Sequence, residues 1–143
     1  MAIVAVPRNE IELNLTLPQY ESRVPAGFPS PADDYMDKGL DLNEHLILHP
    51  AATFYCRVIG ESMRELGIFD GDLLIVDRAI EAQHGDVVLA AVDGELACKV
   101  LDLRRRRLLS ANDEYPPIVI AEGSECQVEG VVTSSIRRHR CLR

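Results

Sequence analysis

Two residues of this chain, Lys99 in ELACKVL and Ser62 in IGESM, have side chains suited to act together as a base and a nucleophile. The chain holds thirteen arginines but only two lysines, and Lys99 stands in an apolar, strand-like run. An unpaired ammonium is costly to bury, and lysine, unlike arginine, can give up its proton when it is desolvated. We therefore interpret Lys99 as a candidate general base. The alternative is an exposed lysine on the solvent face of the strand beside Glu95, and the sequence leaves both open.

Ser62 is the candidate nucleophile. Gly60 allows a sharp turn, after which Ser62 would open the short helical stretch SMREL with its hydroxyl presented rather than packed. Backbone N–H groups at that point, those of Ser62 and Met63, would face an oxyanion. The alternative is that Ser62 is only the N-cap of the helix, as serine before a helix often is. A serine with a lysine base is a known nucleophile–base pair, and it requires a lysine pKa lowered by burial.

Other catalytic or binding patterns are weak in this sequence. It contains no G-x-S-x-G elbow, no phosphate-binding glycine loop and no cluster of metal ligands, so we expect no metal and no cofactor. His45 and His49 are four residues apart, but the segment HLILHP that holds them contains no acidic residue and no cysteine. We interpret the acids of FDGD, at residues 69–72, and the pair Asp33 and Asp34 as turn-formers.

A run of four arginines, residues 104–107, falls between two predicted strands. Its simplest interpretation is the solvated tip of a hairpin, and docking to an acidic or nucleic-acid partner is the alternative. Because the whole chain has a formal charge of −8, four arginines do not make it a general nucleic-acid-binding protein. We expect no strong direct binding to DNA.

The pattern along the chain predicts a mainly β protein with an N-terminal arm. Residues 1–26 are an arm broken by prolines, in which ELNLTL (residues 12–17) could pair as an edge strand. Residues 27–50 are a linker containing a short helix that opens near Asp41 or Asn43 and ends at Pro50. Residues 51–143 form a compact domain. Its expected strands are residues 53–60, 70–78, 107–111, 116–122 and 126–136, with a hairpin over 85–103 that turns at Asp93-Gly94.

The composition favours a cytoplasmic protein. No apolar run approaches the roughly 18 residues of a membrane span, and the opening MAIVAV lacks the basic start of a signal peptide. With no export signal, we expect Cys56, Cys98, Cys126 and Cys141 to be reduced thiols.

Five segments, in this order, carry a resemblance: VPAGFPSPADDY, VIGESM, GIFDGDLLIVD, HGDVVLAAVDGELACKV and EGVVTSSI. Together they resemble the LexA/UmuD family of self-cleaving Ser-Lys proteins, and most closely its UmuD members, from about residue 20 onward. The resemblance implies the compact β domain found at the C-terminus of that family, preceded by an extended arm. It also implies that Ser62 is the nucleophile, Lys99 the general base, and Ala26-Gly27 the bond that is cut.

The residues around that bond agree with this role. Pro25 and Pro29 favour extended backbone on both sides, and Gly27 lacks a side chain that would hinder approach to the bond. UmuD proteins are better known for Cys-Gly at the cut, whereas Ala-Gly is the pair typical of LexA. We expect this difference to change the rate of cleavage and not its mechanism.

The resemblance further implies a role in the SOS response to DNA damage. A RecA filament on single-stranded DNA would stimulate the cut, and the shortened homodimer would join a UmuC-like translesion polymerase. One alternative is a LexA-like repressor. It would have to lack its DNA-binding domain, because the 26 acidic, proline-broken residues before the cut cannot build a helix-turn-helix. The other is a non-catalytic interaction module with the same fold.

Overall fold

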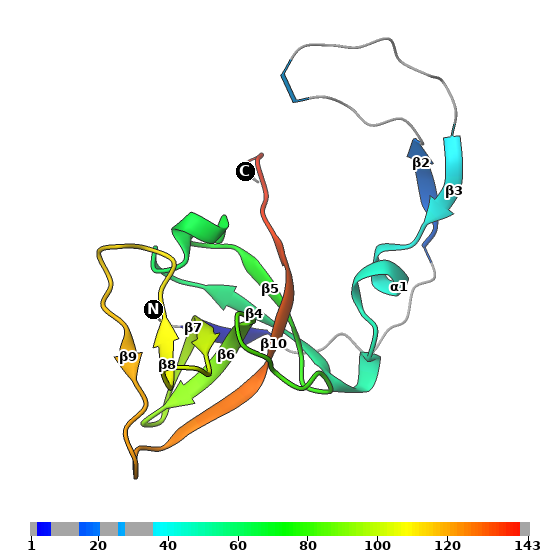
Figure 1. Cartoon of the computed structure of the whole chain (residues 1–143). Coiled ribbons are helices and arrows are strands. Elements are labelled where there is room, and N and C mark those ends of the chain that lie inside the picture. Colours follow the sequence, from blue (N-terminus) through cyan, green and yellow to red (C-terminus); the bar gives the residue numbers. More distant parts are fainter. Residues whose placement is uncertain (1–2, 7–14, 21–25, 28–35, 141–143) are drawn as a thin grey trace. The chain divides into compact units, whose positions relative to one another are not determined.

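The described part of the chain is built mainly from antiparallel β-strands (Figure 1). The computed structural model describes residues 3–6, 15–20, 26–27 and 36–140. The chain divides into two compact units, one formed by residues 1–8 with 49–143 and the other by residues 9–48. The mainly β fold expected from the sequence is confirmed.

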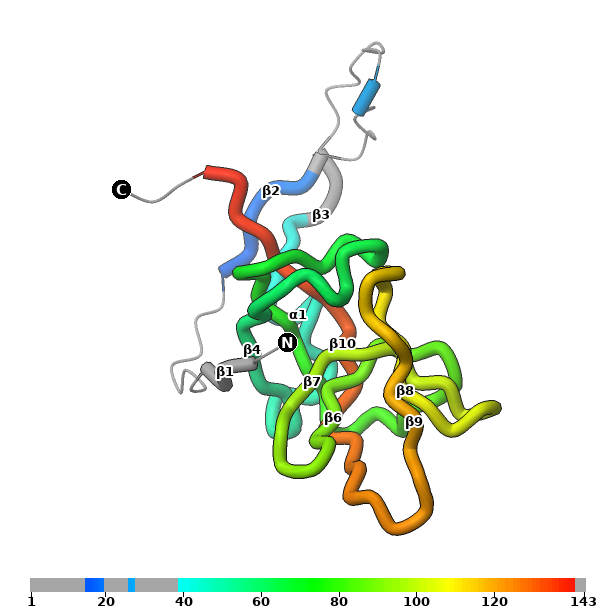
Figure 2. Tube along the Cα trace, turned by 90° about the vertical axis from the view of Figure 1, so that its left-hand side faces the viewer, coloured from blue at the N-terminus to red at the C-terminus, as the bar shows by residue number. Residues whose placement is uncertain are grey.

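The larger unit holds one eight-stranded sheet in the order β1-β4-β5-β10-β6-β7-β8-β9. Figure 2 shows β6, β7 and β8 side by side in this sheet. The long strand β10 pairs with both β5 and β6 and so joins the two halves of the sheet. The strands are β1 (Ile3–Val6), β4 (Thr53–Val58), β5 (Leu73–Asp77), β6 (Val87–Val92), β7 (Glu95–Asp102), β8 (Arg107–Leu109), β9 (Ile118–Val119) and β10 (Cys126–Ile136).

The hairpin of β6 and β7 turns through Asp93 and Gly94, as predicted. Both residues have positive φ angles, 48° and 83°, which is the backbone of a two-residue hairpin turn. This turn fixes the register of the two strands, in which Val92 lies opposite Glu95 and Val88 lies opposite Lys99. The position of Lys99 in the sheet therefore follows from a local sequence signal.

Buried side chains form two hydrophobic clusters. The first includes Leu89 and Cys98, and the second includes Val88 and Leu101. Because neighbouring residues of a strand point to opposite faces, the sheet is packed on both faces where β6 and β7 pair. The other buried members of the first cluster are Cys56, Val58, Met63, Ile68, Leu74 and Val76, and those of the second are Ala90, Leu108 and Val131.

Strand β10 bends where its register shifts, between Val128 and Gly130 and again between Val132 and Ser134. Gly130 sits in close contact with β5. A Cβ at this position would lie 2.6 Å from Cγ1 of Val76 and 3.1 Å from the carbonyl oxygen of Asp77. The backbone can approach β5 this closely because the residue has no side chain.

The smaller unit contains a two-stranded sheet, β2 (Leu17–Tyr20) with β3 (Met36–Leu40). Pro18 falls where the register of this pair shifts, a position that a proline tolerates because it has no N–H to donate. The predicted strand over residues 12–17 is only partly tested, because residues 12–14 lie outside the described residues. Residues 15 and 16 belong to no strand, so the strand is displaced towards the C-terminus.

The short helix α1 (Leu42–Leu46) opens at Asp41, as predicted. The Asp41 side chain accepts a hydrogen bond of 2.9 Å from the N–H of Asn43, which caps the helix. The prediction that Pro50 ends this helix is wrong, because the helix stops at Leu46 and Pro50 instead begins the 3-10 turn η1 (Pro50–Ala52). Among the described residues, no helix has the length and apolar composition needed to cross a membrane.

Candidate active site

Ser62 lies in the loop that connects β4 to β5. Two backbone hydrogen bonds close the base of this loop, from Gly71 N–H to Val58 O (2.7 Å) and from Val58 N–H to Asp72 O (2.8 Å). Gly60 has a φ of 99°, which favours glycine, and its N–H donates to the Asp70 carboxylate at 2.7 Å. The sharp turn predicted at Gly60 is therefore confirmed, and the loop leaves the sheet in a fixed direction.

The helical stretch predicted after Ser62 is one turn of 3-10 helix, η2 (Arg64–Leu66). Its N-cap is Met63, with no side-chain capping bond, so the interpretation of Ser62 as the N-cap is wrong. The turn is held by bonds from Arg64 N–H to Glu61 O (3.3 Å) and from Leu66 N–H to Met63 O (3.2 Å). Neither of these bonds uses the amide of Met63.

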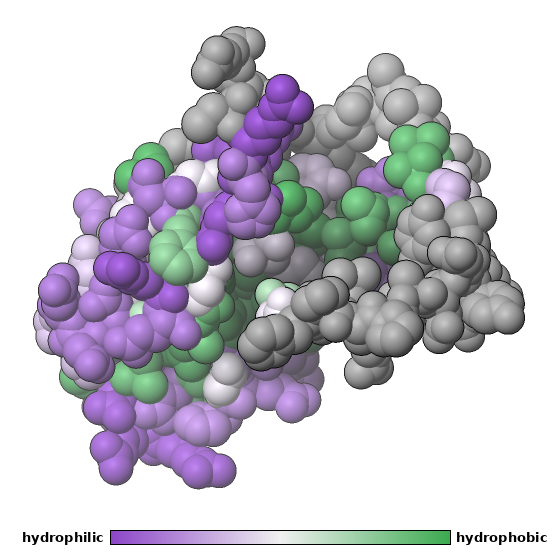
Figure 3. Space-filling view, turned by 90° about the horizontal axis from the view of Figure 1, so that it is seen from above, coloured by the Kyte–Doolittle hydropathy of each residue, from purple (hydrophilic) through white to green (hydrophobic). Residues whose placement is uncertain are grey.

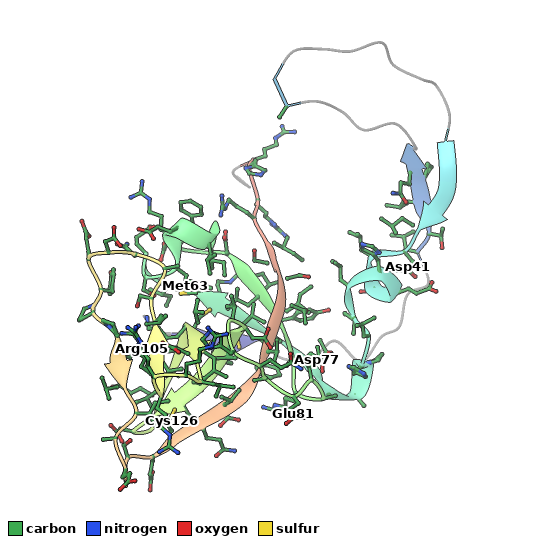
Figure 4. The ribbon with its side chains drawn as sticks, in the orientation of Figure 1. Asp41, Met63, Asp77, Glu81, Arg105 and Cys126 are labelled. Carbon is green, nitrogen blue, oxygen red and sulfur yellow. The ribbon has the colours of Figure 1, made fainter. Side chains whose placement is uncertain are left out.

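Ser62 and Met63 are both fully buried. Met63 packs in the first hydrophobic cluster, and Figure 4 shows it beneath the loop that carries η2. The expectation that the Ser62 hydroxyl would be presented rather than packed is therefore wrong. A substrate can reach this hydroxyl only if the atoms around it move.

Lys99 is also buried, with 5% of its surface exposed, so the alternative of a solvent-facing lysine is wrong. Burial lowers the pKa of its ammonium from the ordinary value of 10.5, against an opposing effect of the Cys98 thiolate. Burial also raises the pKa of Cys98 to about 12, so at neutral pH Cys98 is an uncharged thiol and offers no counter-charge. No described carboxylate forms an ion pair with Lys99.

One segment, residues 110–115, contacts both the Ser62 loop and Lys99. The Asn112 side-chain amide donates to Glu61 O at 2.8 Å, and Glu65 N–H donates to Ala111 O at 2.7 Å. The Tyr115 ring lies with its centre 5.8 Å from the Lys99 amine. Sequence reasoning missed Asn112 and Tyr115, because their stretch NDEY carries no catalytic motif and its contacts are distant in sequence.

Ala26 and Gly27, the predicted scissile pair, belong to the smaller unit. Both residues are exposed and lie in a bend of the backbone. A Cβ at Gly27 would meet nothing within 4 Å. Pro25 and Pro29, which were expected to hold the bond extended, lie outside the described residues.

The FDGD acids do more than form a turn. Asp72 is buried, and both of its oxygens accept hydrogen bonds of 3.0 Å from the guanidinium of Arg137, which follows β10. Burial raises the pKa of Asp72, but the bonds from Arg137 and from Phe69 N–H outweigh it and hold the pKa below its ordinary value. This pair ties the end of the Ser62 loop to the C-terminal end of the sheet.

Comparison with known proteins identifies the family to which the chain belongs. A family model described as Peptidase S24-like matches residues 18–133, a range that includes Ser62, Lys99 and Ala26-Gly27. The chain belongs to the peptidase S24-like family. Protein SamA of Salmonella typhimurium is 45% identical over 141 residues, which cover 98% of each chain. The resemblance to the LexA/UmuD family stated from the sequence is confirmed.

Two further relatives show how much of each chain this similarity covers. Protein ImpA of Escherichia coli is 48% identical over 126 residues, covering 88% of this chain and 87% of ImpA. The LexA repressor of Xylella fastidiosa is 38% identical over 120 residues, covering 82% of this chain but 56% of the repressor. The similarity thus spans nearly the whole of the small relatives and about half of the repressor.

Proposed function

We propose that Ser62 and Lys99 form a catalytic dyad that cuts this chain once, at Ala26-Gly27. The proposal rests above all on Lys99, a buried lysine with no described carboxylate to hold its charge. The contacts of residues 110–115 with both Lys99 and the Ser62 loop support it. Membership of the peptidase S24-like family supports the reaction class.

In the proposed reaction, the neutral Lys99 amine accepts the proton of the Ser62 hydroxyl as its oxygen attacks the carbonyl carbon of Ala26. The amides of Ser62 and Met63 donate to the oxyanion that forms. The tetrahedral intermediate collapses, the bond to the Gly27 nitrogen breaks, and the Lys99 ammonium protonates the departing amine. Water then hydrolyses the ester between Ser62 and Ala26, with Lys99 again taking and returning the proton.

Burial of Ser62 gives the reaction a means of control. Because the hydroxyl is fully buried, the cut is slow until the surroundings of the loop rearrange to admit the peptide. A cavity of about 410 Å³ lies along this loop, and residues flanking the Ala26-Gly27 bond are proposed to bind in it. It is lined by Arg64, Glu65, Phe69, Asn112 and Glu114.

The biological role follows from the resemblance to UmuD. We infer that a RecA filament on single-stranded DNA stimulates the cut during the SOS response. The shortened cytoplasmic homodimer then acts as a subunit or regulator of a UmuC-like translesion polymerase. High similarity to SamA and ImpA over nearly the whole chain supports a UmuD-like protein over a repressor.

Intact-mass spectrometry after incubation with RecA, single-stranded DNA and a nucleotide cofactor tests this role. We expect a fragment that begins at Gly27, formed faster than without RecA. Ser62→Ala and Lys99→Arg should give no fragment, because the latter keeps the charge but cannot lose its proton. Matched changes elsewhere, Ser135→Ala and Lys38→Arg, should leave the cut intact.

A wild-type chain that stays whole with RecA would favour the non-catalytic interaction module. A fragment from Ser62→Ala would remove Ser62 from the mechanism. A cleavage rate that RecA does not change would be compatible with the dyad but would refute the proposed trigger.

A further inference from the structure

The turn between β7 and β8 carries a basic pocket whose lining includes neither Ser62 nor Lys99. The cavity measures about 400 Å³, within the range of small ligand sites. Its basic lining comes from His84, Arg104, Arg105 and Arg107, and its apolar lining includes Val100 and Leu109. Figure 4 labels Arg105 beside β8, and Figure 3 shows hydrophobic residues lying among hydrophilic ones on the face seen from above.

A buried carboxylate holds this turn in shape. Asp102 accepts hydrogen bonds from the N–H groups of Arg104 (3.1 Å) and Arg105 (3.2 Å) and from Nε of Arg107 (2.8 Å). The bond from Arg107 is the main reason that the pKa of Asp102 lies below its ordinary value. Asp102 thus balances the charge of Arg107 and fixes the backbone of the turn. The turn therefore keeps its shape without a ligand.

The guanidinium groups of Arg104 and Arg105 remain available. Both residues are exposed, and neither takes part in an ion pair within the described part of the chain. The interpretation of residues 104–107 as a solvated tip therefore holds for residues 104–106, while Arg107 is half-buried and paired. Two unpaired guanidinium groups on a fixed turn can each bind a carboxylate through two parallel hydrogen bonds.

His84 completes the polar wall of the pocket. Its Nδ1 lies 3.2 Å from the N–H of Leu103 and 3.5 Å from a carboxylate oxygen of Asp102. The contact with the Leu103 N–H holds the ring against the turn. Leu103 itself is 54% exposed and adds apolar surface at the same turn.

We propose that this pocket binds an acidic peptide segment of a protein partner. Carboxylates of the segment bind Arg104 and Arg105, and an aliphatic side chain between them packs on Val100 and Leu109. A nucleic-acid strand fits less well, because no Phe, Tyr or Trp lines the cavity to stack on bases. The apolar side chains of Val100 and Leu109 also have no hydrogen-bond donor for a phosphate backbone.

Fluorescence anisotropy with a labelled short peptide of alternating Asp and Leu tests the proposal. We expect Arg104→Glu with Arg105→Glu to weaken binding by about tenfold or more, because each reversal replaces an attraction by a repulsion. Arg138→Glu with Arg140→Glu is the matched control. It changes the net charge equally at two other exposed arginines and should change the affinity by less than about twofold.

Two further probes decide the chemistry. A peptide of alternating Asp and Ser should bind more weakly, and equal binding would overturn the apolar part of the proposal. An oligothymidylate of the same length that binds more tightly than the Asp-Leu peptide would overturn it in favour of nucleic acid. Failure of the Asp-Leu peptide to bind, or equal losses in both double variants, would overturn the pocket as a site. Thermal melting of each variant verifies that the fold is kept.

Discussion

Lys99→Met should make the protein more stable at neutral pH while removing its proposed activity. Lys99 is buried without a described counter-ion, and methionine fills a similar volume without a charge. Below the lowered pKa, the folded protein must hold a desolvated ammonium that the unfolded chain keeps in water. Each unit by which burial lowers that pKa corresponds to about 1.4 kcal/mol of lost stability.

The attraction between the Lys99 amine and the Tyr115 ring opposes this gain. At 5.8 Å from the ring centre it contributes about 0.5–1 kcal/mol. Replacing even a buried ion pair by apolar groups of similar size can stabilise proteins by about 1–4 kcal/mol. Desolvation therefore exceeds the ring contact, and we expect a net gain of about 1–3 kcal/mol, or about 3–10 °C in Tm.

The gain should depend on pH in a direction set by the lowered pKa. Between that pKa and 10.5, the unfolded chain binds a proton that the folded protein does not, so wild-type stability rises with pH. The advantage of Lys99→Met is therefore full at lower pH and fades as the pH approaches 10.5. Urea unfolding at several pH values measures it, with Lys38→Met as the matched control. A loss of stability at neutral pH, or a difference that does not vary with pH, would refute the argument.

Three other substitutions probe the frame of the site. Asn112→Ala removes the bond to Glu61 O and should slow self-cleavage by about tenfold with little change in Tm; an unchanged rate would show that this bond does not position the loop. Gly130→Ala forces a Cβ against Val76 and should cost about 1–3 kcal/mol in urea unfolding, whereas a neutral result would mean that β10 shifts freely. Asp72→Asn weakens the pair with Arg137, whose stabilising effect is present above pH 3.8 and lost as the pH falls through the lowered pKa of Asp72. The variant should therefore be less stable at neutral pH and match the wild type in strong acid, and a deficit that persists in acid would contradict the ion-pair account.

The parts of the fold that sequence reasoning predicted are those set by local signals. Asp93-Gly94 fixed the hairpin and so placed Lys99 within a paired strand. Alternating and β-branched residues predicted β4, β5 and β10, and the Asp41 cap predicted the start of α1. In each of these cases the cause lies within a few residues of its effect.

The parts that it missed depend on contacts between distant residues. His49 has no acidic neighbour in sequence, yet the fold brings its Nδ1 to 2.6 Å from the carboxylate of Asp77. The sequence predicted only a turn residue at Asp72, whereas in the structure Asp72 pairs with Arg137, 65 positions later. Burial of Ser62 likewise depends on how its loop packs after the sheet has formed, and no local pattern carries that information.

The most direct test of the dyad is the mass of the chain after incubation at alkaline pH without RecA. Wild-type protein should yield a fragment that begins at Gly27, at a rate that rises with pH as the Lys99 ammonium loses its proton, while Ser62→Ala and Lys99→Arg stay whole. A rate that does not change with pH, or a Gly27 fragment from either variant, would contradict the account.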